Sequence, residues 1–366
     1  MKIAIFHDHF STVGGAERVT LVLASGLGAD VITTDINRKS IEKMGFSKVP
    51  IKSLGKTVNF PILKQISASV KFAACDFSDQ YDFFIFVGDW AYFAAKKHKP
   101  NMWYCLSPTR VFYDLYETIS KRLNTVERTI FKSWVALHKQ ASKRYLEHVQ
   151  DIVTLSKNVQ RRIKKYLARE SRVIYPPVDI SKYQFAGYGD FWLSVNKIWN
   201  PEKRAELQLR AFERLPDEKL IVVSTPAKDA RALAYEQKIL RNIPKNVEVV
   251  RSISEDELID LYARCKGVIS TPIDEDFGLT AIEGMACGKP IVAVNEGGYL
   301  ETVIDGVTGK LANPRADDLA RAIKKVSTNV EKYKEPCKKR AKMFDTSRFI
   351  SQFKEEIERI VSQKRF

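Results

Sequence analysis

The sequence lacks most features that would place the chain outside the cell or across a membrane. Five cysteines are spread along it without a CxxC spacing: Cys75, Cys105, Cys265, Cys287 and Cys337. An odd, scattered set argues against a disulfide framework and against a zinc site, and favours a reducing compartment. The apolar run at residues 3–6 is too short for a signal peptide, and the longest apolar stretch, residues 83–95, is interrupted by Asp89. We therefore expect a cytoplasmic protein, at most peripheral on the inner face of a membrane.

Other function classes are disfavoured by missing patterns. The chain has no low-complexity segment, short repeat, zinc finger, recognition helix or aromatic ribonucleoprotein motif, so we expect no nucleic-acid partner. What it has is a globular composition, with 366 residues, 45% hydrophobic and 28% charged, and this length suits two domains. The net charge of +16 favours anionic partners such as a phospholipid surface or a phosphorylated substrate, although solubility alone would also account for it.

Strands alternate with helices along the chain. The apolar segments KIAIF, DVITTD, YDFFIFVGD, NMWYCLS and DIVTLS are predicted strands separated by helical segments, an order typical of a parallel sheet covered on both faces. Pro176-Pro177 cannot continue a helix or a central strand and is the predicted linker. The alternation then restarts with FWLSVNK, KLIVVS, VEVVRS and GVISTP. We predict an α/β protein with domains at 1–177 and 178–345, and an amphipathic helix at 346–366 packed back on the first domain.

The most informative stretch is TPIDEDFGLTAIEGMACGKPIVAVNEGGYLETV, residues 271–303. A strand end, an acidic loop and a helix beginning near Leu279 or Thr280 follow one another, and ligands of such sheets bind beyond the carboxyl ends of strands. The helix start suits a phosphate, whereas Glu275 and Glu283 suit the vicinal hydroxyls of a ribose or a hexose. A sugar nucleotide offers both kinds of group. The two glutamates taken alone are better read as solvated charges, because their spacing is a loose pattern that occurs by chance.

Longer segments add a resemblance. DEDFGLTAIEGMACGKPIVAVNEGGYLETVIDGVTGKL resembles the donor-binding signature of family 4 retaining glycosyltransferases, and HDHFSTVGGAERV resembles their N-terminal Gly-Gly loop. LSKNVQRRIKKYLARESRVIYPPVD is similar to the interdomain segment of these enzymes, and FWLSVNKIWNPEKRAELQLRAFERLP to the first strand, basic loop and helix of their C-terminal domain. The matches cover most of the chain in the family's order. They imply the GT-B fold, with two Rossmann-like, doubly wound domains facing across a cleft.

The resemblance also implies roles for single residues. Glu283 would hold the donor ribose, Glu275 would lie near the donor sugar, and Lys197 and Lys203 would neutralise the diphosphate. Lys197 stands where arginine is usual, and Asn200 is an apparent insertion that leaves the register of Lys203 open. The cradle for the sugar and phosphate would consist of the backbone N–H groups of Phe277, Gly278, Leu279 and Thr280. Gly14 and Gly15 would allow close approach of a ligand, or simply form a tight turn.

One position departs from the family. In WYCLSPTR, Leu106 replaces a histidine that ordinarily contacts the donor sugar, while Arg110 still matches. Leucine can neither form a hydrogen bond through its side chain nor titrate. His7, Asp8 and His9 at the end of the first strand are the candidate substitutes, although a histidine there is more often structural.

The resemblance implies a hexosyltransferase, similar to the mannosyltransferases of surface-polysaccharide and lipopolysaccharide assembly. It would move a sugar with retention from GDP-mannose, or alternatively a UDP-sugar, to a glycan or lipid-linked acceptor, with no metal or other cofactor. Because of Leu106, a second function remains an alternative: a non-catalytic protein that binds a nucleotide sugar or partners an active transferase. A nucleotide-sugar epimerase is the third alternative. The basic stretch 110–169, with interleaved aromatic residues, favours docking on anionic lipid headgroups, or else a set of solvated helix faces.

Overall fold

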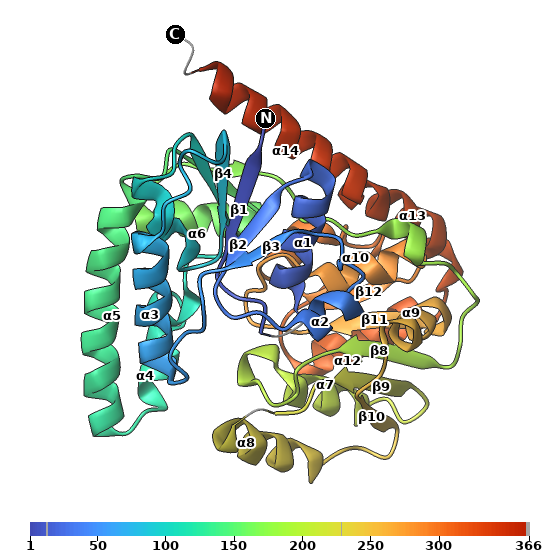
Figure 1. Ribbon diagram of the computed structural model, residues 1–366. Coiled ribbons are helices and arrows are strands. Elements are labelled where there is room, and N and C mark those ends of the chain that lie inside the picture. Colours follow the sequence, from blue (N-terminus) through green and yellow to red (C-terminus); the bar gives the residue numbers. More distant parts are fainter. Residues whose placement is uncertain (12–13, 228, 364–366) are drawn as a thin grey trace. The chain divides into compact units, whose positions relative to one another are not determined.

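The computed structural model describes residues 1–11, 14–227 and 229–363, and the chain divides into two compact units (Figure 1). Unit 1 comprises Met1–Pro177 and Ser347–Phe366, and unit 2 comprises Val178–Thr346. The chain thus leaves unit 1 directly after Pro176-Pro177 and returns to it with its last helix, α14 (Thr346–Ser362). Residues 364–366 of the expected C-terminal helix, like residues 12–13 of the Gly-Gly loop, lie outside the described residues.

Unit 1 is built on a parallel sheet with the strand order β3-β2-β1-β4-β5-β6-β7. Its described strands are β1 (Ile3–His7), β2 (Asp30–Thr33), β3 (Ile51–Ser53), β4 (Phe83–Val87), β5 (Asn101–Cys105), β6 (Asp151–Thr154) and β7 (Arg172–Val173). The central strands β1 and β4 are buried along their whole length, which is why their sequences are continuously apolar rather than alternating. The order reverses between β1 and β4, so these neighbours define the switch point of this sheet.

Helices cover both faces of this sheet (Figure 1). They are α1 (Gly15–Leu27), α2 (Arg38–Lys43), α3 (Pro61–Ala74), α4 (Tyr116–Lys121), α5 (Thr125–Leu146), α6 (Lys157–Leu167) and α14, with 3-10 turns at Ala91–Lys96 and Arg110–Phe112. On α14 the ring of Phe353 meets Tyr104 edge-on at 5.0 Å, and Arg359 pairs with Asp151 at 2.6 Å. Gly26 of α1 leaves the space that Ile350 fills, so α14 is part of the packed structure of unit 1.

Unit 2 repeats the design with the strand order β10-β9-β8-β11-β12-β13, again parallel throughout. Its described strands are β8 (Phe191–Val195), β9 (Lys219–Ser224), β10 (Val247–Arg251), β11 (Gly267–Ser270), β12 (Ile291–Val294) and β13 (Gly309–Ala312). Its helices are α7 (Ala205–Phe212), α8 (Ala230–Leu240), α9 (Glu255–Arg264), α10 (Leu279–Ala286), α11 (Tyr299–Thr302), α12 (Ala316–Ser327) and α13 (Lys334–Ala341). Short 3-10 turns occupy Ile180–Lys182, Pro201–Lys203, Glu331–Tyr333 and Lys342–Phe344. Two doubly wound α/β units therefore make up the chain.

Candidate functional site

The predicted donor residues of unit 2 gather at the switch point of its sheet. Strands β8 and β11 are hydrogen-bonded neighbours, and the strand order reverses between them. The loop after β8 carries Lys197 and Lys203, and the loop after β11 carries Glu275. Both loops leave the carboxyl ends of parallel strands, the edge at which such sheets bind ligands.

Lys203 and Glu275 contact each other directly. The ammonium of Lys203 donates to Oε2 of Glu275 at 2.7 Å, and the two side chains are 31% and 20% exposed. The loops are joined further by the Ile273 N–H, which donates to the Glu202 carbonyl at 2.8 Å. The side chain of Asn200 accepts a hydrogen bond from the Glu202 N–H at 3.0 Å and so caps the 3-10 turn at residues 201–203. The apparent insertion that left the position of Lys203 uncertain is thus the cap of this turn. Lys197 is exposed, with its ammonium 5.8 Å from the centre of the Trp199 ring.

A Gly-Gly turn fixes the acidic loop from the other side. Arg204 donates two hydrogen bonds to the carboxylate of Glu296, at 2.6 and 3.4 Å, and the Asp274 N–H donates to the same carboxylate at 3.2 Å. A Cβ on Gly297 would lie 2.5 Å from the Glu275 nitrogen, and one on Gly298 would overlap the Phe277 backbone. The backbone of the acidic loop therefore packs directly on the backbone of the Gly-Gly turn, at a distance that leaves no room for a side chain on either glycine.

Helix α10 begins at Leu279, at the residue that the sequence predicts. Gly278 adopts φ +92° before it, and a Cβ there would lie 2.5 Å from the buried ring of Tyr299. Phe277 is buried against Phe344 with ring centroids 5.3 Å apart. The first turn of α10, which includes Thr280, has N–H groups without a carbonyl partner within the helix. The packing of Phe277 and Gly278 holds this helix start in place.

Glu283 lies on the second turn of α10 and is half-buried. Its Oε2 accepts a hydrogen bond of 2.7 Å from the hydroxyl of Tyr262, a fully buried side chain at the end of α9. Burial and the neighbouring carboxylate raise the pKa of Tyr262 well above its usual value, so its hydroxyl stays protonated and donates to Glu283. Glu275 and Glu283 are accordingly held by different partners, one by an ammonium and one by a hydroxyl.

In unit 1, His7 at the end of β1 is buried, Asp8 after it is half-buried, and both are engaged within the fold. Burial lowers the pKa of His7 to about 3, and its Nδ1 lies 3.1 Å from the Thr20 hydroxyl. The Asp8 carboxylate accepts from the backbone N–H groups of residues 89–91 at 2.7 to 2.9 Å. Burial raises the pKa of Asp8 to about 6 in spite of these donors. His9 is half-buried, with Nδ1 2.8 Å from the Ser11 hydroxyl.

The remaining predicted residues of unit 1 follow β1 and β5, the strands on either side of β4. Gly14 precedes α1, where Gly15 is the first residue, and a Cβ on Gly14 would lie 2.6 Å from Oε2 of Glu17. Its φ of −155° is ordinary extended backbone, and the Glu17 carboxylate is the end of a flexible side chain. Leu106 follows β5 and is half-buried, and Arg110 pairs with Asp114 through Nε at 2.8 Å and a terminal nitrogen at 2.7 Å.

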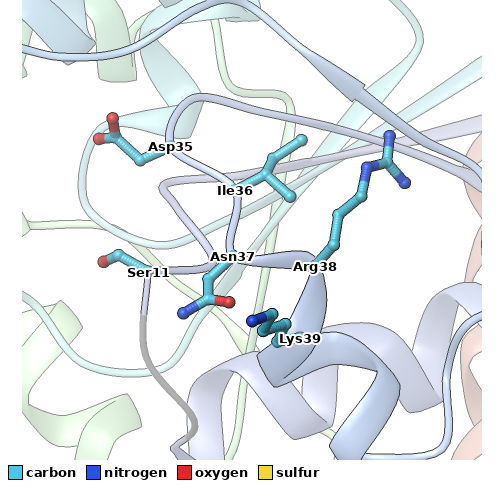
Figure 2. A pocket seen from close by; sticks show the side chains of 6 residues that line it. All are labelled: Ser11, Asp35, Ile36, Asn37, Arg38 and Lys39. Carbon is cyan, nitrogen blue, oxygen red and sulfur yellow. The ribbon is translucent and has the colours of Figure 1, made fainter.

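A pocket of about 630 Å³ lies beside His9, at the carboxyl end of β2. Figure 2 shows the side chains that line it, which are Ser11, Asp35, Ile36, Asn37, Arg38 and Lys39. Asp35 is held by the Thr57 N–H at 3.0 Å and by Lys64 at 3.7 Å, whereas Arg38 and Lys39 are exposed. The segment DINRKS was not among the site residues predicted from the sequence, although a polar and basic loop after a buried strand is a signal that could have found it.

Two further findings concern the described residues as a whole. Within them, no cluster of three or more His, Cys, Asp and Glu side chains is arranged to hold a metal ion. No helix in the described ranges has the length and apolar character needed to span a bilayer.

Several residues that hold the site were not anticipated. They are Tyr262, which orients Glu283, and the pair of Arg204 and Glu296, which joins the loop after β8 to the residue before the Gly-Gly turn. The pattern NEGG places Glu296 next to the glycines, but only the fold brings Arg204 to it. In the sequence, Tyr262 occupies a core-facing position of a predicted helix. The sequence does not indicate which carboxylate its hydroxyl contacts.

Comparison with known proteins finds relatives that are named glycosyltransferases. Residues 182–343 match the family model described as glycosyl transferases group 1. The chain is similar to alpha-1,3/1,6-mannosyltransferase ALG2 of Dictyostelium discoideum, at 26% identity over 387 residues that cover 89% of each chain. ALG2 of Candida glabrata is 25% identical over 88% of this chain and 84% of the relative.

Solved structures share the fold. Anabaena Alr3699/HepE in complex with UDP and glucose aligns with a TM-score of 0.75 at 19% identity, covering 98% of this chain and 99% of that one. Sucrose-phosphate synthase from Thermosynechococcus elongatus aligns with a TM-score of 0.75 at 16% identity, covering 99% and 100%. At these identities the likeness establishes two Rossmann-like units of the GT-B type.

Proposed function

We propose that this GT-B glycosyltransferase, which resembles group 1 mannosyltransferases, transfers a hexose from a nucleotide diphosphate sugar to a hydroxyl of a glycan or lipid-linked acceptor. The transfer retains the anomeric configuration and needs no metal ion. GDP-mannose is the favoured donor, because the relatives that match most of the chain are named mannosyltransferases. A UDP-sugar is the alternative donor. Unit 2 binds the donor and unit 1 the acceptor.

The observation that carries this proposal is the loop 274–278 at the switch point of the unit 2 sheet. It sets a carboxylate, Glu275, beside an ammonium, Lys203, at 2.7 Å and directly precedes the N-terminus of α10. The first N–H groups of α10 and the lysine carry positive charge that suits a diphosphate. The carboxylates of Glu275 and Glu283 are acceptors that suit sugar hydroxyls. A nucleotide diphosphate sugar satisfies both at once.

The chemistry follows from the same charges. The bond from the anomeric carbon to the diphosphate breaks as the acceptor oxygen bonds to that carbon, and the departing diphosphate takes the acceptor proton. Negative charge grows on the diphosphate, and Lys197, Lys203 and the start of α10 stabilise it there. Tyr262 keeps Glu283 in one orientation by hydrogen bonding, so the ribose contact costs little side-chain entropy.

Leu106 removes a polar contact that related enzymes have, and His9 is our candidate to replace it. Burial keeps His7 neutral, and the carboxylate of Asp8 is occupied by backbone N–H groups. His9 is half-buried beside the pocket of unit 1, where an exposed arginine and lysine suit an acceptor that carries an anionic group.

The testing experiment is calorimetric titration with GDP, UDP, GDP-mannose and UDP-glucose. We expect one nucleotide to bind, and Glu283→Gln to weaken its binding about 10- to 100-fold, because the ribose hydroxyls lose a charged acceptor and one of its two oxygens becomes a donor. Glu335→Gln, on the exposed surface of α13, is the matched control and should leave the dissociation constant unchanged.

Product analysis completes the test. With the matching nucleotide sugar we expect turnover that survives chelation of metals and yields a product with the donor's anomeric configuration. Tight nucleotide binding without transfer to any glycan or lipid-linked acceptor would favour the non-catalytic reading. Absence of binding to all four ligands would contradict the donor site.

A further inference from the structure

Large apolar side chains on the surface are concentrated on two helices of unit 1. Eight of the fourteen that the described part of the chain exposes lie at residues 58–70 and 126–137, in or just before α3 and α5. Single exposed apolar residues are ordinary, but a contiguous patch marks a surface that meets something other than water.

On α3 the exposed apolar residues follow the helical period. Leu63, Ile66 and Val70 recur at positions i, i+3 and i+7 and are 48%, 40% and 60% exposed. Residues at this spacing lie on one face of a helix. The opposite face packs inward through Ala68 and Phe72, both fully buried. Helix α3 therefore has a second apolar stripe, which faces outward, where a surface helix of a soluble domain normally carries polar groups.

Helix α5 presents a matching stripe. Val126, Ile130 and Leu137 are 70%, 53% and 63% exposed and again share one helical face. That face adjoins Trp134, whose indole N–H donates to Oε1 of Gln65 on α3 at 3.0 Å. The two helices lie side by side (Figure 1). We call the two stripes together the α3–α5 face.

The charges on these two helices are almost all basic. The sequence from Leu54 to Cys75 contains three lysines and no acidic residue. Helix α5 has a single acidic residue, Glu127, whose side chain caps the helix start, against five lysines and arginines. Of these, Lys132, Lys143 and Arg144 are exposed. A protein partner or a second copy would have to bring a matching acidic surface, whereas an anionic bilayer provides negative charge outside an apolar layer.

We propose that the α3–α5 face docks on an anionic phospholipid surface, with the apolar stripes at the level of the acyl-chain boundary and the lysines and arginine among the headgroups. Shallow insertion of an amphipathic helix plus attraction of basic residues is sufficient for reversible membrane binding. Such docking requires no donor and no turnover, so it can fail while the proposed transferase reaction stands, and the reverse also holds.

The test is co-sedimentation of the full chain with vesicles of phosphatidylcholine mixed with phosphatidylglycerol, and with vesicles of phosphatidylcholine alone. We expect binding only to the mixed vesicles, weakening as salt screens the charges. Lys132→Gln/Lys143→Gln should weaken binding roughly tenfold, since each charge near the surface contributes to the attraction. Leu63→Ser/Val70→Ser should weaken it by roughly tenfold as well, because both side chains lose apolar burial.

Matched controls come from unit 2. Leu233→Ser/Val307→Ser replaces side chains of similar exposure, 46% and 48%, and Lys324→Gln/Lys325→Gln removes two exposed charges from α12. Neither should change binding, and circular dichroism should show all variants folded, because every substituted side chain is exposed. Equal binding to phosphatidylcholine alone, or α3 and α5 variants that bind as the wild type does, would overturn the proposal. So would dimers in sedimentation velocity that Leu63→Ser/Val70→Ser abolishes, because a second copy would then be the occupant.

Discussion

At the scale of single residues, two ion pairs of unit 2 have the same geometry and different surroundings. Lys203 meets Glu275 at 2.7 Å, and Lys266 meets Glu218 at 2.7 Å, with all four side chains partly buried. Lys203 follows the carboxyl end of β8, on the ligand-binding edge of the sheet, whereas Lys266 directly precedes β11 at the other edge. Their contributions to stability should be similar and small. Their contributions to transfer should differ.

We predict that Lys203→Gln lowers kcat roughly 100-fold, the size expected when one preorganised donor to a developing negative charge is removed. Lys266→Gln is the control and should leave kcat within about twofold while changing stability comparably. Steady-state kinetics with the identified nucleotide sugar measures both. Equal effects of the two substitutions on kcat would mean that Lys203 only supports the fold.

The register of Lys203 also marks a limit of sequence reasoning. The residue type and the basic loop could be predicted, but Asn200 left the position open. The structure brings Lys203 to Glu275 because Asn200 caps the turn and the Lys203 carbonyl accepts from the Asn196 side chain at 3.2 Å. Such pairing depends on two loops 72 positions apart in the chain, and no local pattern encodes it.

At the scale of elements, the Gly-Gly turn between β12 and α11 determines the shape of the acidic loop. Gly298 has φ −65° and ψ −16°, a conformation open to any residue, so its side chain is excluded by space alone. An added Cβ would overlap the Cα of Phe277 and crowd the Asp276 carbonyl, both backbone atoms that cannot rotate away.

We predict that Gly298→Ala lowers the free energy of unfolding of unit 2 by about 2 kcal/mol through overpacking and weakens nucleotide binding at least about tenfold. The measurements are denaturant unfolding and calorimetry. Gly306→Ala is the informative control, because Gly306 has φ +78° but no atom within 4 Å of an added Cβ. It should cost about 1 kcal/mol of backbone strain and leave nucleotide binding intact. An undiminished affinity in Gly298→Ala would show that the loop moves freely without penalty.

Elements were predictable where the sequence is long and strongly patterned. The continuous apolar strands β1, β4, β11 and β12, the start of α10 and the amphipathic α14 could all be predicted from the sequence. Strands β3 and β13 were not predicted, because they are short and partly exposed and therefore lack a continuous apolar run. The outward apolar stripe of α3 also escaped notice, since a periodic pattern does not say which of two apolar faces points to the core.

At the scale of the whole molecule, titratable groups are distributed unequally between the units. All five histidines of the chain lie in unit 1, at positions 7, 9, 98, 138 and 148. Burial lowers the pKa of His7 to about 3 and that of His138 to about 4, and it also lowers the pKa of His98. Unit 2 contains no histidine, so no buried imidazole makes its free energy of unfolding depend on pH near neutrality.

The sign of the effect follows from proton binding. Below the unfolded histidine pKa of 6.5, the unfolded chain binds protons that folded unit 1 excludes, so acidification favours unfolding until the folded pKa values are reached. Asp8 acts in the opposite sense. Its folded pKa of about 6 exceeds the unfolded 3.8, so the stability it contributes is fully present below about pH 3.8 and is lost as the pH rises through about 6. Two buried histidines outweigh one aspartate over most of this window.

We predict that unit 1 loses about 2 to 3 kcal/mol of stability from about pH 7 to about pH 5, at 1.36 kcal/mol per unit of pKa difference, while unit 2 changes much less. Hydrogen exchange of amides in β1 and β4 against those in β11 and β12, corrected for intrinsic rates, measures the two units in one sample. His138→Phe keeps a ring beside Phe93 and Phe112 but cannot bind a proton, so it should restore up to about 2 kcal/mol at pH 5. If unit 2 weakened as much as unit 1, or if His138→Phe left the pH dependence unchanged, the buried imidazoles could not be its cause.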